Sequence, residues 1–346
     1  MNGAHFFLRE KGIVKSEEFS ALYNKKACLR VINNVFRRYS LTVMLSLLVS
    51  MGARAQYDPS FSHYWAMESS FNPAAAGKES KLNVTGAYNM TMVGFENNPK
   101  TMYIGGDMPL YLAGAYHGVG LQLLNDEIGL FSHKRVSGQY AYKHRLLGGT
   151  ISVGVQAGFL SETFDGSKVD TEQDNDLAFA KSSVNGSAFD LGAGIYYSHR
   201  NWHVGASVQH ATGPTVELGE TNELDISQTF YFSAGYNIRL RNPFLSLDTY
   251  LFGRTDGVAY RGDVTARLKY THEKRVMYAG LSYSPTNSVT VLLGGLFHGI
   301  LFGYGYEIYT SAINIGNGSH ELFVGYQTDI DLYKKGRNRH QSVRIL

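Results

Sequence analysis

Apolar and polar residues alternate along most of the chain. Residues 151–159 and 189–197 place apolar side chains at odd positions and mostly polar side chains or glycine at even positions. Residues 261–270 are the strongest case, because every odd position carries Arg, Asp, Thr or Lys and every even position carries Gly, Val, Ala, Leu or Tyr. A period of two places the two sets on opposite faces of a β-strand. The alternation alone is compatible with a soluble barrel and with a membrane barrel of reversed facing.

The alternation predicts about fourteen strands. Most are close to the roughly 9 to 11 residues that a tilted strand needs to cross a bilayer. No stretch after residue 55 reaches the run of about 18 apolar residues that a membrane-spanning helix requires. The predicted strands cover residues 82–91, 100–109, 113–123, 132–144, 148–161, 188–199, 202–212, 225–239, 245–255, 261–272, 275–284, 289–297, 300–309 and 320–331.

The connections between these strands alternate between short and long. Every second connection is short, and the short ones cover residues 110–112, 146–147, 200–201, 240–244, 273–274 and 298–299. The intervening connections are longer on average, notably residues 162–187 and 213–224. Outer-membrane barrels have short periplasmic turns and long outer loops. We therefore predict an all-β fold, a transmembrane antiparallel outer-membrane β-barrel of about 14 strands over residues 82–331.

Tyrosines gather near the ends of the predicted strands. They would form interfacial girdles in a membrane barrel, although ordinary cross-strand packing explains any one of them equally well. The residues concerned are Tyr140, Tyr142, Tyr196, Tyr197, Tyr304, Tyr306 and Tyr309.

Composition agrees with a strand-rich fold. Of 346 residues, 44% are apolar and 18% charged, which excludes a disordered chain. The net charge of +3 hides an asymmetry, because the first 55 residues hold nine basic and three acidic groups. The remaining chain is therefore slightly acidic, and a nucleic-acid-binding face is not expected.

The N-terminal region has the pattern of a secretory signal peptide. Residues 41–51 form an uncharged apolar run that follows Arg37 and Arg38 and precedes the small-x-small site Ala53-Arg54-Ala55. As a helix this run spans only ~16 Å, against a hydrocarbon core of ~30 Å. We predict that residues 1–55 are an N-terminal extension and signal peptide, cleaved on export to the outer membrane.

Two segments flank the predicted barrel. Residues 56–81 include an aromatic-rich stretch, 57–77, that either enters the periplasmic mouth of the barrel as a plug or docks a periplasmic partner. Residues 332–346 form a basic tail in the same compartment, because an even strand count returns both ends to one side. The candidate partner contacts in this tail are Lys334, Lys335, Arg337 and Arg339.

No catalytic motif is present in the sequence. It lacks His-Glu-x-x-His, a Gly-x-Ser-x-Gly elbow and a phosphate-binding Gly-x-x-x-x-Gly-Lys-Ser/Thr loop. No Cys/His group has zinc-site spacing, and the acidic residues 170–176 are interpreted as a solvated outer loop, with a Ca²⁺ site as the alternative. We predict a non-enzymatic protein without a cofactor or metal.

Several charged residues are predicted to face the lumen. They could line a diffusion channel or ligand transporter, or they could neutralise one another as ion pairs. These residues are Arg135, Lys143, Arg261, Arg267, Lys269 and Glu321. The sequence is therefore compatible with two functions, an interaction scaffold and a diffusion channel or ligand transporter.

Short motifs, taken in their order and spacing, resemble one known family. They are Asn72-Pro73 with Gly77, Gly94-Phe95 with Pro99, Asn125-Asp126 with Gly129, His320-Glu321, and Arg344 near the end. The chain resembles the PorP/SprF membrane proteins of the type IX secretion system over residues 56–346.

The resemblance implies an outer-membrane component of that system, in contact with membrane lipid. It implies partners among the periplasmic ring components and a peptidoglycan-binding lipoprotein. It also implies secreted cargo with a C-terminal sorting domain, such as adhesins.

Overall fold

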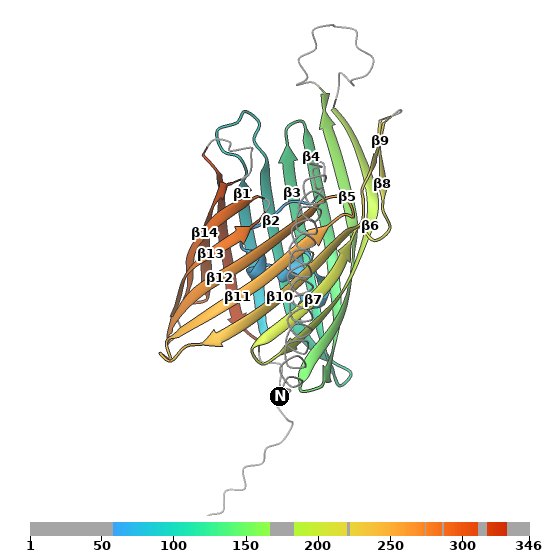
Figure 1. Cartoon of the computed structure of the whole chain (residues 1–346). Helices are drawn as coiled ribbons and strands as arrows, with labels where there is room; N and C mark the ends of the chain where they lie inside the picture. The colour runs from blue at the N-terminus through green and yellow to red at the C-terminus, as the bar shows by residue number, and fades with distance from the viewer. Residues whose placement is uncertain are drawn as a thin grey trace, which may run out of the picture. The chain divides into compact units, whose positions relative to one another are not determined.

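The computed structural model describes residues 58–166, 183–219, 222–273, 275–285, 287–310 and 317–330. The predicted signal peptide, the acidic residues 170–176 and the basic tail lie outside the described residues. Figure 1 shows tilted strands arranged around a central lumen. The sheet closes on itself because β1 pairs with β16, with Lys81 opposite Asp329.

Fourteen antiparallel strands form this barrel, in the order β1-β16-β15-β14-β13-β12-β11-β10-β7-β6-β5-β4-β3-β2, which confirms the predicted fold class. The strands are β1 (Lys81–Met90), β2 (Lys100–Leu112), β3 (Ala115–Ile128), β4 (Phe131–Leu146), β5 (Gly149–Asp165), β6 (Ser183–His199), β7 (Trp202–Gln209), β10 (Thr229–Arg239), β11 (Leu245–Thr255), β12 (Tyr260–His272), β13 (Arg275–Ser284), β14 (Ser288–Phe297), β15 (Ile300–Tyr309) and β16 (Ser319–Asp329). Among the described residues, no helix has the length and apolar character needed to cross a membrane.

The barrel is apolar outside and polar inside. On β12, Val264 is 52% exposed on the outer face, whereas Asp263 and Arg267 are buried on the lumen face. Leu281 on β13 is also exposed on the outer face, at 58%. This facing suits a hydrocarbon surround, in which closure satisfies every strand's backbone hydrogen bonds.

Two of the predicted girdle tyrosines are placed differently. Tyr140, Tyr142 and Tyr304 are exposed on the outer face, but Tyr196 is only 5% exposed and lies among lumen residues with Ala74. The prediction for Tyr196 was wrong because the apolar run at residues 195–197 hides the period of two. Ile195 and Tyr197 continue the outward set of β6, and Tyr196 between them faces inward. Tyr309 of β15 also belongs to a lumen-facing set, because it pairs in register with buried Ser288 and its hydroxyl contacts buried Ser319.

The strand ends differ in places from the predicted ends. We call the end of the barrel that carries the short connections the short-connection end, and the opposite end the long-connection end. At the short-connection end, β2 continues to Leu112, and the turn to β3 is Ala113-Gly114, in which both residues have positive φ. At the long-connection end, β5 continues to Asp165 and β6 begins at Ser183, so both strands enter the predicted loop 162–187. β7 ends at Gln209, earlier than predicted, and β10 begins at Thr229, later than predicted.

The predicted loop 213–224 contains a hairpin of its own. Strands β8 (Thr215–Leu218) and β9 (Asn222–Asp225) pair only with each other. Val216, Leu218 and Ile226 are buried against Leu160 of β5. Because Leu160 belongs to the buried, lumen-facing set of β5, the hairpin packs on the inner side of the barrel wall.

The lumen contains residues 58–77, which precede β1 and which we call the inner segment. It forms three short 3-10 helices, η1 (Tyr64–Ala66), η2 (Glu68–Ser70) and η3 (Pro73–Ala75). Asn72 caps η3 by accepting a 3.0 Å hydrogen bond from the Ala74 backbone N–H, and Pro73 occupies the first turn, where its missing donor costs nothing.

Candidate functional site

The inner segment begins with a buried carboxylate, Asp58. Its Oδ2 accepts a 2.6 Å hydrogen bond from the Tyr231 hydroxyl, and its Oδ1 lies 3.2 Å from His210 Nε2 and 3.4 Å from Arg135 Nη1. Arg254 donates to the backbone carbonyls of Asp58 and Pro59 at 2.5 and 2.9 Å. Burial alone would raise the pKa of Asp58, but the His210 and Arg135 charges outweigh it and hold that pKa below its ordinary value.

A second carboxylate, Glu321 of β16, holds the middle of the inner segment. It accepts hydrogen bonds from the backbone N–H groups of Ser62 and His63 at 2.5 and 2.9 Å. The same carboxylate lies 2.6 Å from His63 Nδ1. Glu321 and His63 are both almost fully buried, so each group depends on the other for a polar partner.

The third carboxylate, Glu68, belongs to the inner segment itself. Lys78 Nζ lies 2.9 Å from Glu68 Oε2, and His203 Nε2 of β7 lies 3.0 Å from Oε1. Burial would raise the pKa of Glu68, but the Lys78 charge and the His203 hydrogen bond lower it to about 2.

The last turn of the inner segment approaches the wall closely. Asn72 Nδ2 donates to the Ile195 carbonyl at 3.1 Å, and the Gly77 N–H donates to Asp107 Oδ2 at 2.7 Å. Lys143 donates to the Gly77 carbonyl. Gly77 has φ +60, and a Cβ there would lie 2.7 Å from the Met108 carbonyl oxygen, so only glycine fits.

Aromatic packing fills the space between these polar anchors. Tyr64 stacks on Phe252 with ring centroids 4.7 Å apart, and its hydroxyl donates to Thr265 at 2.8 Å. The Arg267 guanidinium lies 3.6 Å from the Trp65 ring centroid, in a cation–π contact. The inner segment is therefore anchored by charges and hydrogen bonds and packed by rings.

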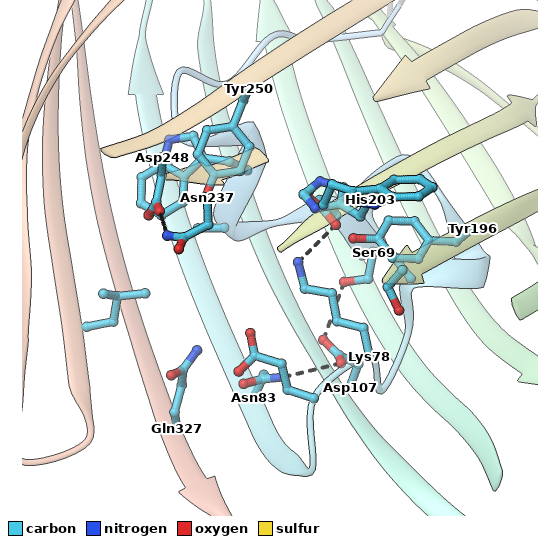
Figure 2. A pocket seen from close by; sticks show the side chains of 18 of the residues that line it. Ser69, Lys78, Asn83, Asp107, Tyr196, His203, Asn237, Asp248, Tyr250 and Gln327 are labelled. Atoms are coloured by element: carbon cyan, nitrogen blue, oxygen red, sulfur yellow. Dashed lines mark hydrogen bonds and ion pairs between the residues drawn. The ribbon is translucent and has the colours of Figure 1, made fainter. Parts of the chain in front are cut away.

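A polar cavity of about 530 Å³ remains between the inner segment and the short-connection end. Figure 2 shows Asp248, Asn237 and Tyr250 on one side of it and Asp107 and Asn83 on another. Asp248 is paired with Arg267 at 2.7 Å and with Lys269 at 3.1 Å. Paired carboxylates of this kind suit binding and positioning more than acid–base chemistry. No group of metal-ligating side chains occurs among the described residues.

The charges predicted to face the lumen do so, and each has a partner. Arg135 pairs with Asp58, Glu321 with His63, and Arg267 and Lys269 with Asp248. Arg261 lies 3.1 Å from Asp263 and 3.0 Å from Glu307, and Lys143 donates to a carbonyl of the inner segment.

The motif residues fall into two groups in the structure. Asn72, Pro73, Gly77 and Glu321 all lie where the inner segment contacts the barrel wall, but at separate points: Asn72 at β6, Gly77 at β2, and Glu321 of β16 at Ser62 and His63. Asp126 is also buried on the lumen side, where Thr101 donates to it at 2.6 Å.

The other motif residues do not join that site. Most lie near the long-connection end: Gly94 and Phe95, Pro99, Asn125 and Gly129. His320 faces outward against the Tyr304 hydroxyl, and Arg344 lies outside the described residues.

Several site residues were not predicted from the sequence. Asp58, His63 and Glu68 lie within the aromatic stretch 57–77, where a charged side chain among rings is itself a signal of a buried pair. Their partners His203 and His210 have no local signal, because only the closure of the barrel brings them to the inner segment.

Comparisons with known proteins give one family and several barrels. A family model described as type IX secretion system membrane protein PorP/SprF matches residues 53–326. No curated protein matches the chain.

Solved structures that are similar include three outer-membrane proteins. The CymD monoaromatic hydrocarbon channel is 9% identical, with a TM-score of 0.47, over 82% of this chain and 96% of that one. The P. putida toluene transporter TodX is 10% identical, with a TM-score of 0.40, over 72% and 89% of the two chains. A Pseudomonas aeruginosa FadL homologue is 10% identical, with a TM-score of 0.40, over 81% and 96%.

Proposed function

The chain belongs to the PorP/SprF family of type IX secretion system membrane proteins, and on this basis we propose that it is a non-enzymatic scaffold in the outer membrane. In this role it links periplasmic machinery to secreted cargo with a C-terminal sorting domain, such as adhesins. Periplasmic ring components and a peptidoglycan-binding lipoprotein are the proposed partners on the inner side.

The inner segment is the observation that carries this proposal. Its side chains and backbone contact strands on several sides of the lumen: Asp107 on β2 and Glu321 on β16, Ile195 on β6, and Thr265 on β12. A lumen occupied in this way offers little free path for a solute, which favours interaction over diffusion. The partners must then engage the two ends of the barrel.

The alternation of connections orients these ends. Short connections face the periplasm in barrels of this type. Residues 78–81, which lead into β1, and the basic tail, with Lys334, Lys335, Arg337 and Arg339, then lie on the periplasmic side. Asp58 lies toward the opposite end of the lumen, against His210 and Arg135, so the inner segment runs along the lumen and is not confined to its periplasmic mouth. The loops at 162–187 and 213–224 then lie at the extracellular end of the barrel, where they would meet cargo.

A pull-down of the tagged protein from outer membranes tests the scaffold role. Replacing the four basic tail residues with Ala should weaken capture of the periplasmic partner in a salt-sensitive way and leave barrel assembly intact. Shortening the loop at 162–187 should impair cargo display without releasing that partner. The opposite pattern would mean that the orientation is inverted.

Conductance in planar bilayers tests the alternative function. A barrel filled by the inner segment should give no steady channel steps at neutral pH. Large stable steps from the full chain would favour a diffusion channel or ligand transporter instead.

Export is tested separately. We propose cleavage after Ala55, so that the mature protein begins at Gln56. Mass analysis of the membrane-extracted protein should recover no peptide from residues 1–38.

A further inference from the structure

Two cavities adjoin at the short-connection end. The larger one, described above, has about 530 Å³, and a second of about 490 Å³ lies beside it. Ser198 and Arg200, at the end of β6 and the following turn, line both of them. The two cavities therefore form one vestibule, which leads from the inner segment to the mouth of the barrel.

The vestibule opens on the lumen side of the wall, away from the bilayer. Arg145 pairs in register with Thr150, and Thr150 pairs with Ser198, so these three share one face of the sheet. Ser152 of the same face is buried toward the lumen. A ligand reaching these residues comes from the aqueous compartment and not from the lipid surround.

The charges of the vestibule are unevenly satisfied. The carboxylates of Glu68 and Asp248 are already held by cations, and Asp107 accepts hydrogen bonds from Gly77 and Asn83. In contrast, three exposed arginines at the mouth have no ion pair with any residue that the structure describes. They are Arg145, Arg200 and Arg239.

The inner part of the vestibule is lined by cations as well. Lys78 and Lys269 keep 30% and 28% of their side-chain surface exposed, although each is paired with a buried carboxylate. An ammonium group has three N–H donors, so each of these lysines can also bind a carboxylate that enters the cavity.

We propose that the vestibule binds an extended acidic peptide segment, a loop or chain end of a periplasmic partner protein. Carboxylates of the segment meet the three arginines at the mouth and the partly exposed ammonium groups of Lys78 and Lys269 further in. This inference rests on the proposed function, because it assigns a docking site to the partner that the scaffold needs.

The direct test is binding of a defined probe to the full chain in nanodiscs. The probe is a fluorescein-labelled octapeptide of alternating Asp and Gly, and the reference is the same peptide with Asn in place of Asp. We expect anisotropy to show binding of the acidic peptide that weakens as salt rises, and much weaker binding of the neutral one.

A matched pair of variants locates the site. Arg200→Gln/Arg239→Gln should weaken probe binding by about tenfold. Arg241→Gln/Arg275→Gln removes two exposed arginines from the same end that line neither cavity, and it should leave binding nearly unchanged. Equal losses in both pairs, or no loss in the first, would overturn the proposal.

Competition experiments test which class of molecule the vestibule binds. Unlabelled acidic peptide should displace the probe, whereas N-acetylglucosamine oligomers and short-chain phosphatidylglycerol should not. If either of these displaces it better than the peptide does, the site takes a glycan or a lipid headgroup and the proposal is wrong.

The pull-down distinguishes this failure from failure of the function. If wild type and Arg200→Gln/Arg239→Gln capture the same type IX component equally, the vestibule proposal fails and the scaffold role stands. If wild type captures no type IX component at all, the proposed function itself fails.

Discussion

The inner segment and the β8–β9 hairpin both pack on the lumen-facing side of the barrel wall, but different forces hold them. The inner segment is held by buried carboxylates, with Asp58, Glu68 and Glu321 each bound to cations or N–H groups. The hairpin is held by aliphatic contacts between Leu160, Val216 and neighbouring side chains.

The difference bears on how each element can move. A buried charge must keep its partner, so a displaced inner segment would leave unpaired groups on both sides. Aliphatic side chains tolerate small shifts, because their contacts are not directional. The barrel therefore combines a rigid lumen with a more adaptable element at the long-connection end.

Loss of a central anchor should have the largest effect. Glu321→Ala leaves the N–H groups of Ser62 and His63 buried without their acceptor, and it should lower the free energy of unfolding by about 3 to 5 kcal/mol. Urea unfolding of the detergent-solubilised barrel measures this. Glu127→Ala, at an exposed position, is the control and should cost under about 0.5 kcal/mol. Equal stability of the two variants would contradict the anchoring role.

Loss of the aliphatic contact between Leu160 and the hairpin should have a smaller effect on stability, and one confined to the hairpin. Leu160→Ala should favour opening of the hairpin by about 2 to 3 kcal/mol and leave the inner segment in place. Native-state proteolysis within residues 213–224 measures the opening. Phe159→Ala, on the outer face of the same strand, should not change the cleavage rate. If Leu160→Ala instead opens the lumen to ions, the two elements are not independent.

Acid should act on the inner segment and spare the hairpin. The pKa of Glu68 is lowered from 4.5 to about 2, so its contribution is present above about pH 4.5 and is lost as the pH falls toward 2. The loss is on the order of 3 kcal/mol, because a shift of one pKa unit corresponds to about 1.4 kcal/mol. Urea midpoints measured across this range should fall less for Glu68→Gln than for wild type. Stability that rises on acidification would contradict the assigned sign.

Two glycines of the wall offer the mildest comparison. A Cβ at Gly154 would lie 2.4 Å from the Ala74 backbone nitrogen of the inner segment, and one at Gly186 would lie 2.0 Å from the Glu217 carbonyl of the hairpin. Either Gly→Ala variant should cost about 1 to 3 kcal/mol by overpacking. Gly154→Ala should raise conductance, whereas Gly186→Ala should raise proteolysis of the hairpin. If Gly154→Ala instead raised proteolysis of the hairpin and Gly186→Ala raised conductance, the two glycines would not make the contacts assigned to them.

The barrel could be predicted because its signals are local. Period-two alternation on β12 separates Asp263 and Arg267 from Val264 over a few residues, and the short connections mark where strands turn back. Errors arose where a local signal was ambiguous. The apolar run around Tyr196 masked its lumen facing, and polar residues in 213–224 concealed a hairpin whose apolar positions are few.

The sequence by itself determined the strands, their facing, the closed barrel and the charged character of the lumen. Only the tertiary structure decided which charges pair, because Asp58 and His210 are 152 residues apart and meet through closure of the sheet. It also decided that the aromatic stretch enters the lumen and leaves a vestibule at one end. Alternation specifies which face a side chain takes, but the partner across a lumen depends on strand order and register around the whole barrel.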